Sequence, residues 1–123
     1  MSRVIIYDDD KDILEMTSTV LALEGHKTLC RENCSKLSED ITGFQPEVIL
    51  MDNWLPGTRG VDAIKFIKAQ PAFAHIPVIF FSANSNGEEL AKEAGADWLL
   101  KKPFDMGDLL STVKKAAQNA QTN

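Results

Sequence analysis

The stretch VILMDNWLPGTRG, residues 48–60, joins an apolar run to a carboxylate and then to a turn. The run 48–51 predicts a buried strand, because a strand covered on both faces has a nearly continuous apolar sequence. Asp52 follows at once, and Pro56-Gly57 predicts a tight turn. A carboxylate at the end of a core strand is held rigidly by the sheet, at the place where open α/β sheets bind their ligands.

Other apolar runs lie before and after this stretch. With it they make five runs that we expect to form strands: residues 3–7, 26–30, 47–51, 77–81 and 97–101. Four of them are almost entirely apolar, as parallel strands buried on both faces are. The run 26–30 is more polar, which suits a strand nearer an edge of the sheet.

The segments between the runs have the spacing of amphipathic helices. In residues 11–25 an apolar stripe of i, i+3, i+7 and i+8 spacing is formed by Ile13, Met16, Val20 and Leu21. The second helical segment is short, and the fourth has mostly alanine on its apolar face. Five strand–helix units in strict alternation predict an α/β fold: a parallel sheet with right-handed crossovers and helices on both faces.

Composition excludes several classes of protein. A chain of 123 residues is expected to form one domain over 1–123, and its net charge of −5 argues against direct nucleic-acid binding. Neither a signal peptide nor an apolar segment of membrane-spanning length is evident. Cys30 and Cys34 are too few for a disulfide framework or a zinc site, so we expect free thiols in a reducing cytoplasm.

Polar side chains follow four of the five expected strands. They are Asp8, Asp9 and Asp10, then Asp52, Ser82, and finally Lys101 and Lys102. Each is an ordinary loop residue by itself, and the first acids could simply cap a helix. Together they meet at one edge of the sheet, where two carboxylates 5 Å apart repel by roughly 3 kcal/mol. A lysine or a hard divalent cation such as Mg²⁺ would supply the counter-charge.

Four motifs at these positions make the chain resemble the receiver domain of bacterial two-component response regulators, over nearly its whole length. They are YDDD (7–10), LMDNWLPG (50–57), FFSAN (80–84) and KKPF (101–104). The resemblance implies the flavodoxin-like receiver fold, with strand order 2-1-3-4-5 and five helices on both faces. It also implies a phosphorylation-dependent signalling module, which catalyses only its own phosphorylation and slow dephosphorylation.

The resemblance assigns roles to individual residues. Asp52 matches the phospho-acceptor. Together with Asp9 and the backbone carbonyl of Trp54 it would bind Mg²⁺ or Mn²⁺, and Asp8 would act through water. Ser82 matches the switch hydroxyl, which would donate a hydrogen bond to the phosphoryl group. Lys102 matches the lysine that neutralises it, and the Lys102–Pro103 bond is expected to be cis.

The resemblance also indicates partners. A sensor histidine kinase or a histidine phosphotransfer protein would donate the phosphoryl group, docking near Lys11, Leu14 and Glu15, where we expect Leu14 to be exposed. An unidentified downstream protein would read the result. The chain would be a monomer, or a weak dimer through its fourth helix, fifth strand and fifth helix. Met1 favours a complete protein with no output domain after residue 123.

The chain departs from the family pattern at Leu99 and in the segment TRG, residues 58–60, where many receivers have an acid before the glycine. Leu99 stands where the family usually has Tyr or Phe, and strand alternation should turn Trp98 to the opposite face. We therefore expect the fourth loop and its short helix to carry the conformational change. The bulky Trp54, together with Asn84, is expected to slow the attack of water on a phosphorylated Asp52.

Three other classes of protein share some of these features. A phosphohydrolase of the haloacid-dehalogenase type has a DxD motif after its first strand, as in Asp8-x-Asp10. Against this class, the chain has no cap domain, and its lysine comes directly before Pro103, after the fifth expected strand. An FMN carrier on the same sheet would need a hydroxyl-rich phosphate loop in place of the three acids. A pseudo-receiver that binds partners without phosphorylation would not need the complete set of acids, hydroxyl and lysine.

Overall fold

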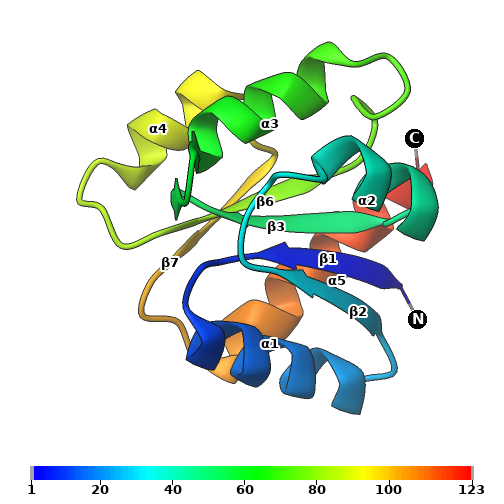
Figure 1. Ribbon diagram of the computed structural model, residues 1–123. Helices are drawn as coiled ribbons and strands as arrows, with labels where there is room; N and C mark the ends of the chain where they lie inside the picture. The colour runs from blue at the N-terminus through cyan, green and yellow to red at the C-terminus, as the bar shows by residue number, and fades with distance from the viewer. Residues whose placement is uncertain (1, 123) are drawn as a thin grey trace.

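The computed structural model describes residues 2–122, with side chains up to residue 118, and shows a parallel sheet between two layers of helices (Figure 1). The five strands of the sheet lie in the order β2-β1-β3-β6-β7. They are β1 (Arg3–Tyr7), β2 (Lys27–Arg31), β3 (Val48–Asp52), β6 (Val78–Ser82) and β7 (Trp98–Lys101). Because β4 and β5 form a separate hairpin, β6 and β7 are the fourth and fifth strands of this sheet along the chain. The order is therefore the expected 2-1-3-4-5, and the predicted fold class is confirmed.

Five helices cover the two faces of the sheet. Apolar side chains of α1 (Lys11–Leu23) and α5 (Met106–Thr122) pack on one face. The opposite face is covered by α2 (Leu37–Phe44), α3 (Gly60–Ala69) and α4 (Gly87–Ala94) (Figure 1). In the part of the chain that the structure describes, no helix has the length and apolar character needed to cross a bilayer.

The loop after β3 contains a small hairpin that the sequence pattern did not predict beyond its turn. Strands β4 (Trp54–Leu55) and β5 (Thr58–Arg59) pair antiparallel around the Pro56-Gly57 turn. Gly57 has a φ of 79°, a left-handed conformation that a residue without a Cβ adopts readily. The hairpin brings the chain back to the end of β3, where α3 begins.

The strand boundaries differ slightly from the predicted ones. Strand β1 is as expected, but the other four begin one residue later, and three of them end one residue later. The reason is that backbone pairing continues past the last apolar residue: Asp52 pairs with Phe81, and Ser82 pairs with Lys101. Asp52 and Ser82 are therefore the last residues of strands and are held by the sheet itself.

Helix α1 is rotated relative to the predicted apolar stripe. Val20 and Leu21 are buried as expected, but Leu14 and Thr17 complete the buried face, and Met16 is 37% exposed. The expectation that Leu14 is exposed is wrong, because it packs in the core between the sheet and α5. Thr17 interrupts the apolar spacing of this face in the sequence, which is why the pattern favoured the neighbouring stripe.

Three smaller expectations are confirmed. Strand β2 lies at an edge of the sheet, and none of its residues is fully buried. In β7, Leu99 packs against the core beneath α2, α3 and α4, while Trp98 packs on the opposite side with α1 and α5. Cys30 and Cys34 are both free and half-buried.

Candidate functional site

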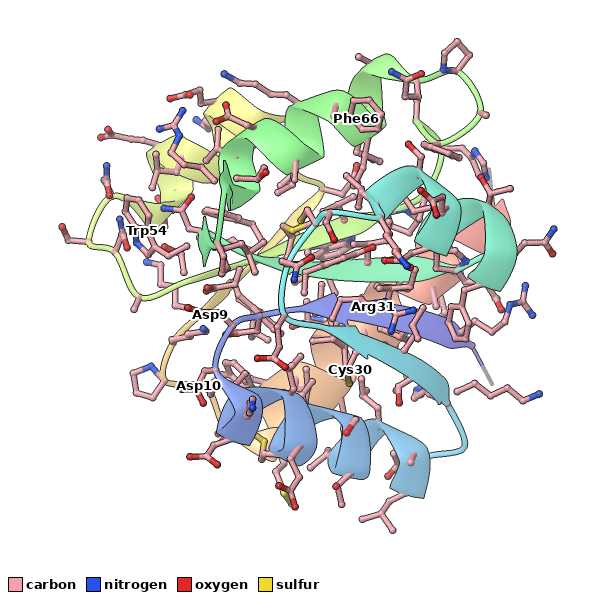
Figure 2. The ribbon with its side chains drawn as sticks, viewed as in Figure 1. Asp9, Asp10, Cys30, Arg31, Trp54 and Phe66 are labelled. Atoms are coloured by element: carbon pink, nitrogen blue, oxygen red, sulfur yellow. The ribbon has the colours of Figure 1, made fainter. Side chains whose placement is uncertain are left out.

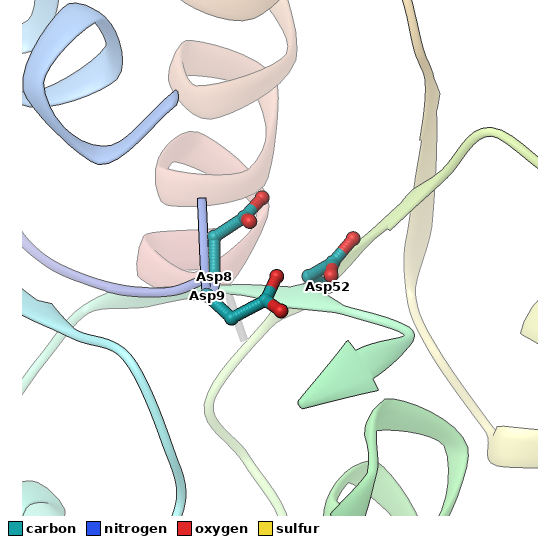
Figure 3. A group of neighbouring side chains, drawn as sticks. All are labelled: Asp8, Asp9 and Asp52. Atoms are coloured by element: carbon teal, nitrogen blue, oxygen red, sulfur yellow. The ribbon is translucent and has the colours of Figure 1, made fainter. Parts of the chain in front are cut away.

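Three carboxylates converge at the carboxyl ends of β1 and β3 (Figure 3). The two strands are adjacent in the sheet, and Tyr7 at the end of β1 pairs with Met51 beside Asp52. The side chains of Asp8, Asp9 and Asp52 each offer an oxygen, and these oxygens lie within 4.8 Å of one another. Asp8 and Asp52 are buried, and Asp9 is exposed.

Lys102 joins two of these acids. Its Nζ donates to Asp8 Oδ2 at 2.7 Å and to Asp52 Oδ1 at 2.9 Å. The side chain is 18% exposed, and its ammonium lies 5.7 Å from the centre of the Phe81 ring. The Lys102–Pro103 bond is cis, as expected, and the Lys102 amide donates to the Ser82 carbonyl at 2.8 Å. The loop after β7 is thus tied to the end of β6.

The charge balance of the site is uneven, because one ammonium faces three carboxylates. Burial, reinforced by the charge of Asp52, raises the pKa of Asp8 above its usual 3.8, although Lys102 and the Asp10 amide oppose this shift. Burial by itself would lower the pKa of Lys102. Its hydrogen bonds to Asp8 and Asp52 outweigh burial and hold the pKa above the usual 10.5.

The backbone around the acids also contributes donors. The amide of Trp54 donates to Asp52 Oδ2 at 3.3 Å, and the amide of Asp10 donates to Asp8 Oδ1 at 2.9 Å. Asp10 itself turns away from the cluster, because its carboxylate accepts the amides of Asp12 and Ile13 and caps α1. Of the three consecutive acids, two serve the cluster and one begins the helix.

Ser82 lies at the same edge but does not contact the acids. Its side chain is buried, and its Oγ accepts the amide of Asn84 at 3.1 Å. Gly87, the first residue of α4, packs close by: a Cβ built there would lie 3.2 Å from Ser82 Oγ and 3.7 Å from Leu99 Cδ1. The start of α4 therefore lies close to both the Ser82 hydroxyl and the Leu99 side chain.

Gly60 is a residue of the site that the motifs did not mark. It begins α3, and its amide donates to the Asn53 carbonyl at 2.7 Å. A Cβ at this position would overlap the carbonyl oxygen of Asp52. The signal in the sequence was the glycine that follows the Pro56-Gly57 turn, at the end of the stretch 48–60.

The donor set fits a hard divalent cation. All three side chains offer carboxylate oxygens, which Mg²⁺ and Mn²⁺ prefer. These three carboxylates face a single ammonium, that of Lys102, which bonds only Asp8 and Asp52. In addition, Asn53 Oδ1, directly after Asp52, is buried and has no hydrogen-bond partner among the described residues.

The fold and the site together define a class of signalling module built on a five-stranded α/β sheet. Residues 4–114 match the family model described as the response regulator receiver domain, so the chain belongs to this family. Receiver domains are signalling modules rather than enzymes in the usual sense, and the family is consistent with phosphorylation-dependent signalling. The hydrolase and the FMN carrier are thereby disfavoured.

Several known proteins are similar to the chain. The phosphate regulon transcriptional regulatory protein PhoB of Pseudomonas aeruginosa is 34% identical over 115 residues, covering 90% of this chain and 49% of PhoB. The regulatory protein AtoC of Escherichia coli is 32% identical, covering 96% of this chain and 26% of AtoC. The chain thus spans half or less of the length of these relatives.

A solved structure gives the same result for the fold. The crystal structure of a response regulator from Chloroflexus aurantiacus superposes with a TM-score of 0.90 at 25% sequence identity. The match covers 95% of this chain and 98% of that one.

Proposed function

We propose that this chain is a phosphorylation-dependent receiver that accepts a phosphoryl group on Asp52 from a histidine kinase or a histidine phosphotransfer protein. The observation that carries the proposal is the bridge from Lys102 to Asp8 and Asp52, at 2.7 and 2.9 Å. This bridge places a fixed positive charge beside the carboxylate that would attack. Positioning and charge neutralisation are the main contributions that proteins make to phosphoryl transfer.

The residues would divide the chemistry as follows. An oxygen of Asp52 attacks the phosphorus, the bond from phosphorus to the donor histidine nitrogen breaks, and an aspartyl phosphate forms. Lys102 neutralises one of the phosphoryl oxygens, and the Trp54 amide, which already donates to Asp52, is placed to donate to the new group. Mg²⁺ or Mn²⁺ would neutralise further negative charge. It would be held by Asp9, Asp52 and the Trp54 carbonyl, with Asp8 acting through water.

The test is the intact mass of the protein after incubation with acetyl phosphate and Mg²⁺. We expect one phosphoryl adduct, and no adduct with Asp52→Asn or in EDTA. An adduct that persists in Asp52→Asn would place the phosphoryl group elsewhere. A folded protein that takes up no phosphoryl group at all would instead support a pseudo-receiver that binds partners without phosphorylation.

Phosphorylation is expected to act on α4 through Ser82. The hydroxyl would leave the Asn84 amide to donate to a phosphoryl oxygen, and Gly87 of α4 lies against it. Hydrogen exchange with and without the phosphoryl mimic beryllofluoride, in the presence of Mg²⁺, tests this. We expect protection to change in residues 83–94 and to stay constant in α2. Unchanged protection in 83–94 would show that the change leaves the site by another route.

Trp54 is expected to protect the phosphorylated state from water. Trp54 is 59% exposed, and its backbone amide donates to Asp52. Replacing it with Asn should shorten the lifetime of the phosphorylated protein roughly threefold or more, because water would reach the aspartyl phosphate more easily. The lifetime is measured by mass after removal of the phosphodonor.

Phe66→Asn is the matched control, since Phe66 is another exposed aromatic, on α3 and away from Asp9 and Trp54 (Figure 2). An equal or longer lifetime in Trp54→Asn than in the unmutated protein would contradict the shielding role.

The wider setting is part of the same proposal. We assign the chain to the cytoplasm as one receiver domain over 1–123, without direct contact to nucleic acid or membrane. It would dimerise weakly, if at all, through α4, β7 and α5. The phosphodonor would dock over α1, where Lys11 and Glu15 are exposed beside the acids and Leu14 is buried beneath them.

A further inference from the structure

A second polar cluster lies behind the site, and the chemistry above does not use it. The hydroxyl of Tyr7 donates to Asp40 Oδ2 at 3.0 Å, and Arg31 Nε donates to Asp40 Oδ1 at 3.2 Å. Tyr7 is fully buried, and Asp40 is 7% exposed. The Arg31 side chain is 43% exposed, and an ion pair with an exposed partner generally adds little stability. A role other than stability is therefore worth testing for Asp40.

The hydrogen bonds of this cluster link the side chains of Tyr7, Asp40 and Arg31 to the backbone amide of Asp8. Tyr7 precedes Asp8, and the amide of Asp8 donates to the carbonyl of Arg31 at 3.1 Å. The side chain of Arg31 returns to Asp40, as does that of Tyr7. One carboxylate on α2 thus holds the last residues of both β1 and β2, where the chain turns into the acidic loop.

At this edge of the sheet, β2 is the outermost strand and pairs with β1. Arg31 lies at the end of β2 (Figure 2), and its side chain pairs with Asp40 on α2. Helix α2 has eight residues, and no side chain caps its N-terminus. Burial, reinforced by the charge of Asp40, raises the pKa of Tyr7 far above its usual 10.0, so the phenol remains a donor at neutral pH.

We propose that Asp40, acting through Tyr7 and Arg31, is a positioning residue that fixes the backbone of Asp8 and so sets the affinity of the acidic site for a divalent cation. The inference rests on the proposed function, in which Asp8 and Asp9 serve Mg²⁺. Residues that orient metal ligands commonly change metal affinity 10- to 100-fold. Asp40 acts one step further from the cation, so we expect Asp40→Asn to raise the Kd for Mg²⁺ about three- to tenfold.

The Mg²⁺ affinity is read from the fluorescence of Trp54, whose amide contacts Asp52, in a Trp98→Phe background that leaves one indole. The variants are Asp40→Asn and Tyr7→Phe, which removes a single hydroxyl and keeps the buried ring. The matched control is Glu39→Gln, which removes the same charge from the exposed neighbour of Asp40 on α2. We expect both variants to weaken Mg²⁺ binding, their double mutant to be less than additive, and the control to change the Kd less than twofold.

Urea unfolding in EDTA separates positioning from structural support. If the two variants lose stability but keep the Kd of the unmutated protein, Asp40 is structural and the inference is overturned. If Glu39→Gln weakens binding as much as Asp40→Asn does, the effect is one of net charge, and the inference is also overturned.

The result for the unmutated protein distinguishes the two levels of the argument. If it neither responds to Mg²⁺ nor accepts a phosphoryl group, the proposed function fails, and the role of Asp40 fails with it. If it does both, and the two variants bind Mg²⁺ as tightly as the unmutated protein, the role of Asp40 is rejected and the proposed function stands.

Discussion

Gly60→Ala is expected to lower the free energy of unfolding by about 3 kcal/mol or more, because the added methyl group meets only backbone atoms. It would overlap the carbonyl oxygen of Asp52 and lie 2.8 Å from the Asp52 carbonyl carbon and 2.9 Å from the Asn53 Cα. None of these atoms can rotate away as a side chain could. Either the end of β3 or the start of α3 must move, so phosphorylation of Asp52 should fall as well.

The control for this prediction is Gly43→Ala. Gly43 lies inside α2, and a Cβ there would meet nothing within 4 Å. Alanine at an open helical position should leave the protein unchanged or up to about 1 kcal/mol more stable. Urea unfolding followed by circular dichroism compares the two variants. Similar stabilities would mean that the backbone at Gly60 yields at little cost.

Lys102→Gln is expected to destabilise the protein by about 2–3 kcal/mol at pH 7 in EDTA, because it leaves Asp8 and Asp52 without their cation. The pKa of Lys102 is raised in the folded protein, so its stabilising contribution is complete below the usual pKa of 10.5. The contribution is lost only as the pH rises through the higher folded value. A measurement at pH 7 therefore reports all of it, and the difference between Lys102→Gln and the unmutated protein should shrink above pH 10.5.

Mg²⁺ should restore more stability to Lys102→Gln than to the unmutated protein, because it replaces the missing positive charge among the carboxylates. Phosphorylation by acetyl phosphate should remain slow even with Mg²⁺, since the ammonium beside Asp52 is absent.

Lys101→Gln is the matched control. Lys101 is the adjacent lysine, its side chain is 62% exposed, and its ion pair with Glu88 lies on the surface. Its loss should change stability by no more than about 0.5 kcal/mol. Equal losses in the two variants would show that Asp8 and Asp52 do not depend on the charge of Lys102.

The fold and the members of the site follow from the sequence because both depend on local patterns. Buried parallel strands require nearly continuous apolar runs, and strict alternation with helices leaves few topologies. Parallel strands also bring their carboxyl ends to one edge, so the residues after each run had to meet. Asp8, Asp9, Asp52 and Lys102 were placed together on this ground, and the structure brings them together.

Details that depend on contacts between distant segments did not follow from the sequence. The buried face of α1 is fixed by packing against the sheet and α5. It cannot be recognised from apolar spacing, because one of its buried residues is the polar Thr17. Asp10 has the same chemistry as Asp8 and Asp9. Its role as a helix cap depends on the backbone path, which brings the amides of Asp12 and Ile13 to its carboxylate.

The tertiary structure alone decided two further features. Gly60 is required because α3 begins against the backbone of Asp52, a contact that depends on how the hairpin folds back. Asp40 acquires the buried Tyr7 and the more exposed Arg31 as partners because α2 packs on the face of the sheet that holds Tyr7. A sequence specifies which residues are apolar, charged or flexible, but the partner of a buried polar group is set by the three-dimensional packing of distant segments.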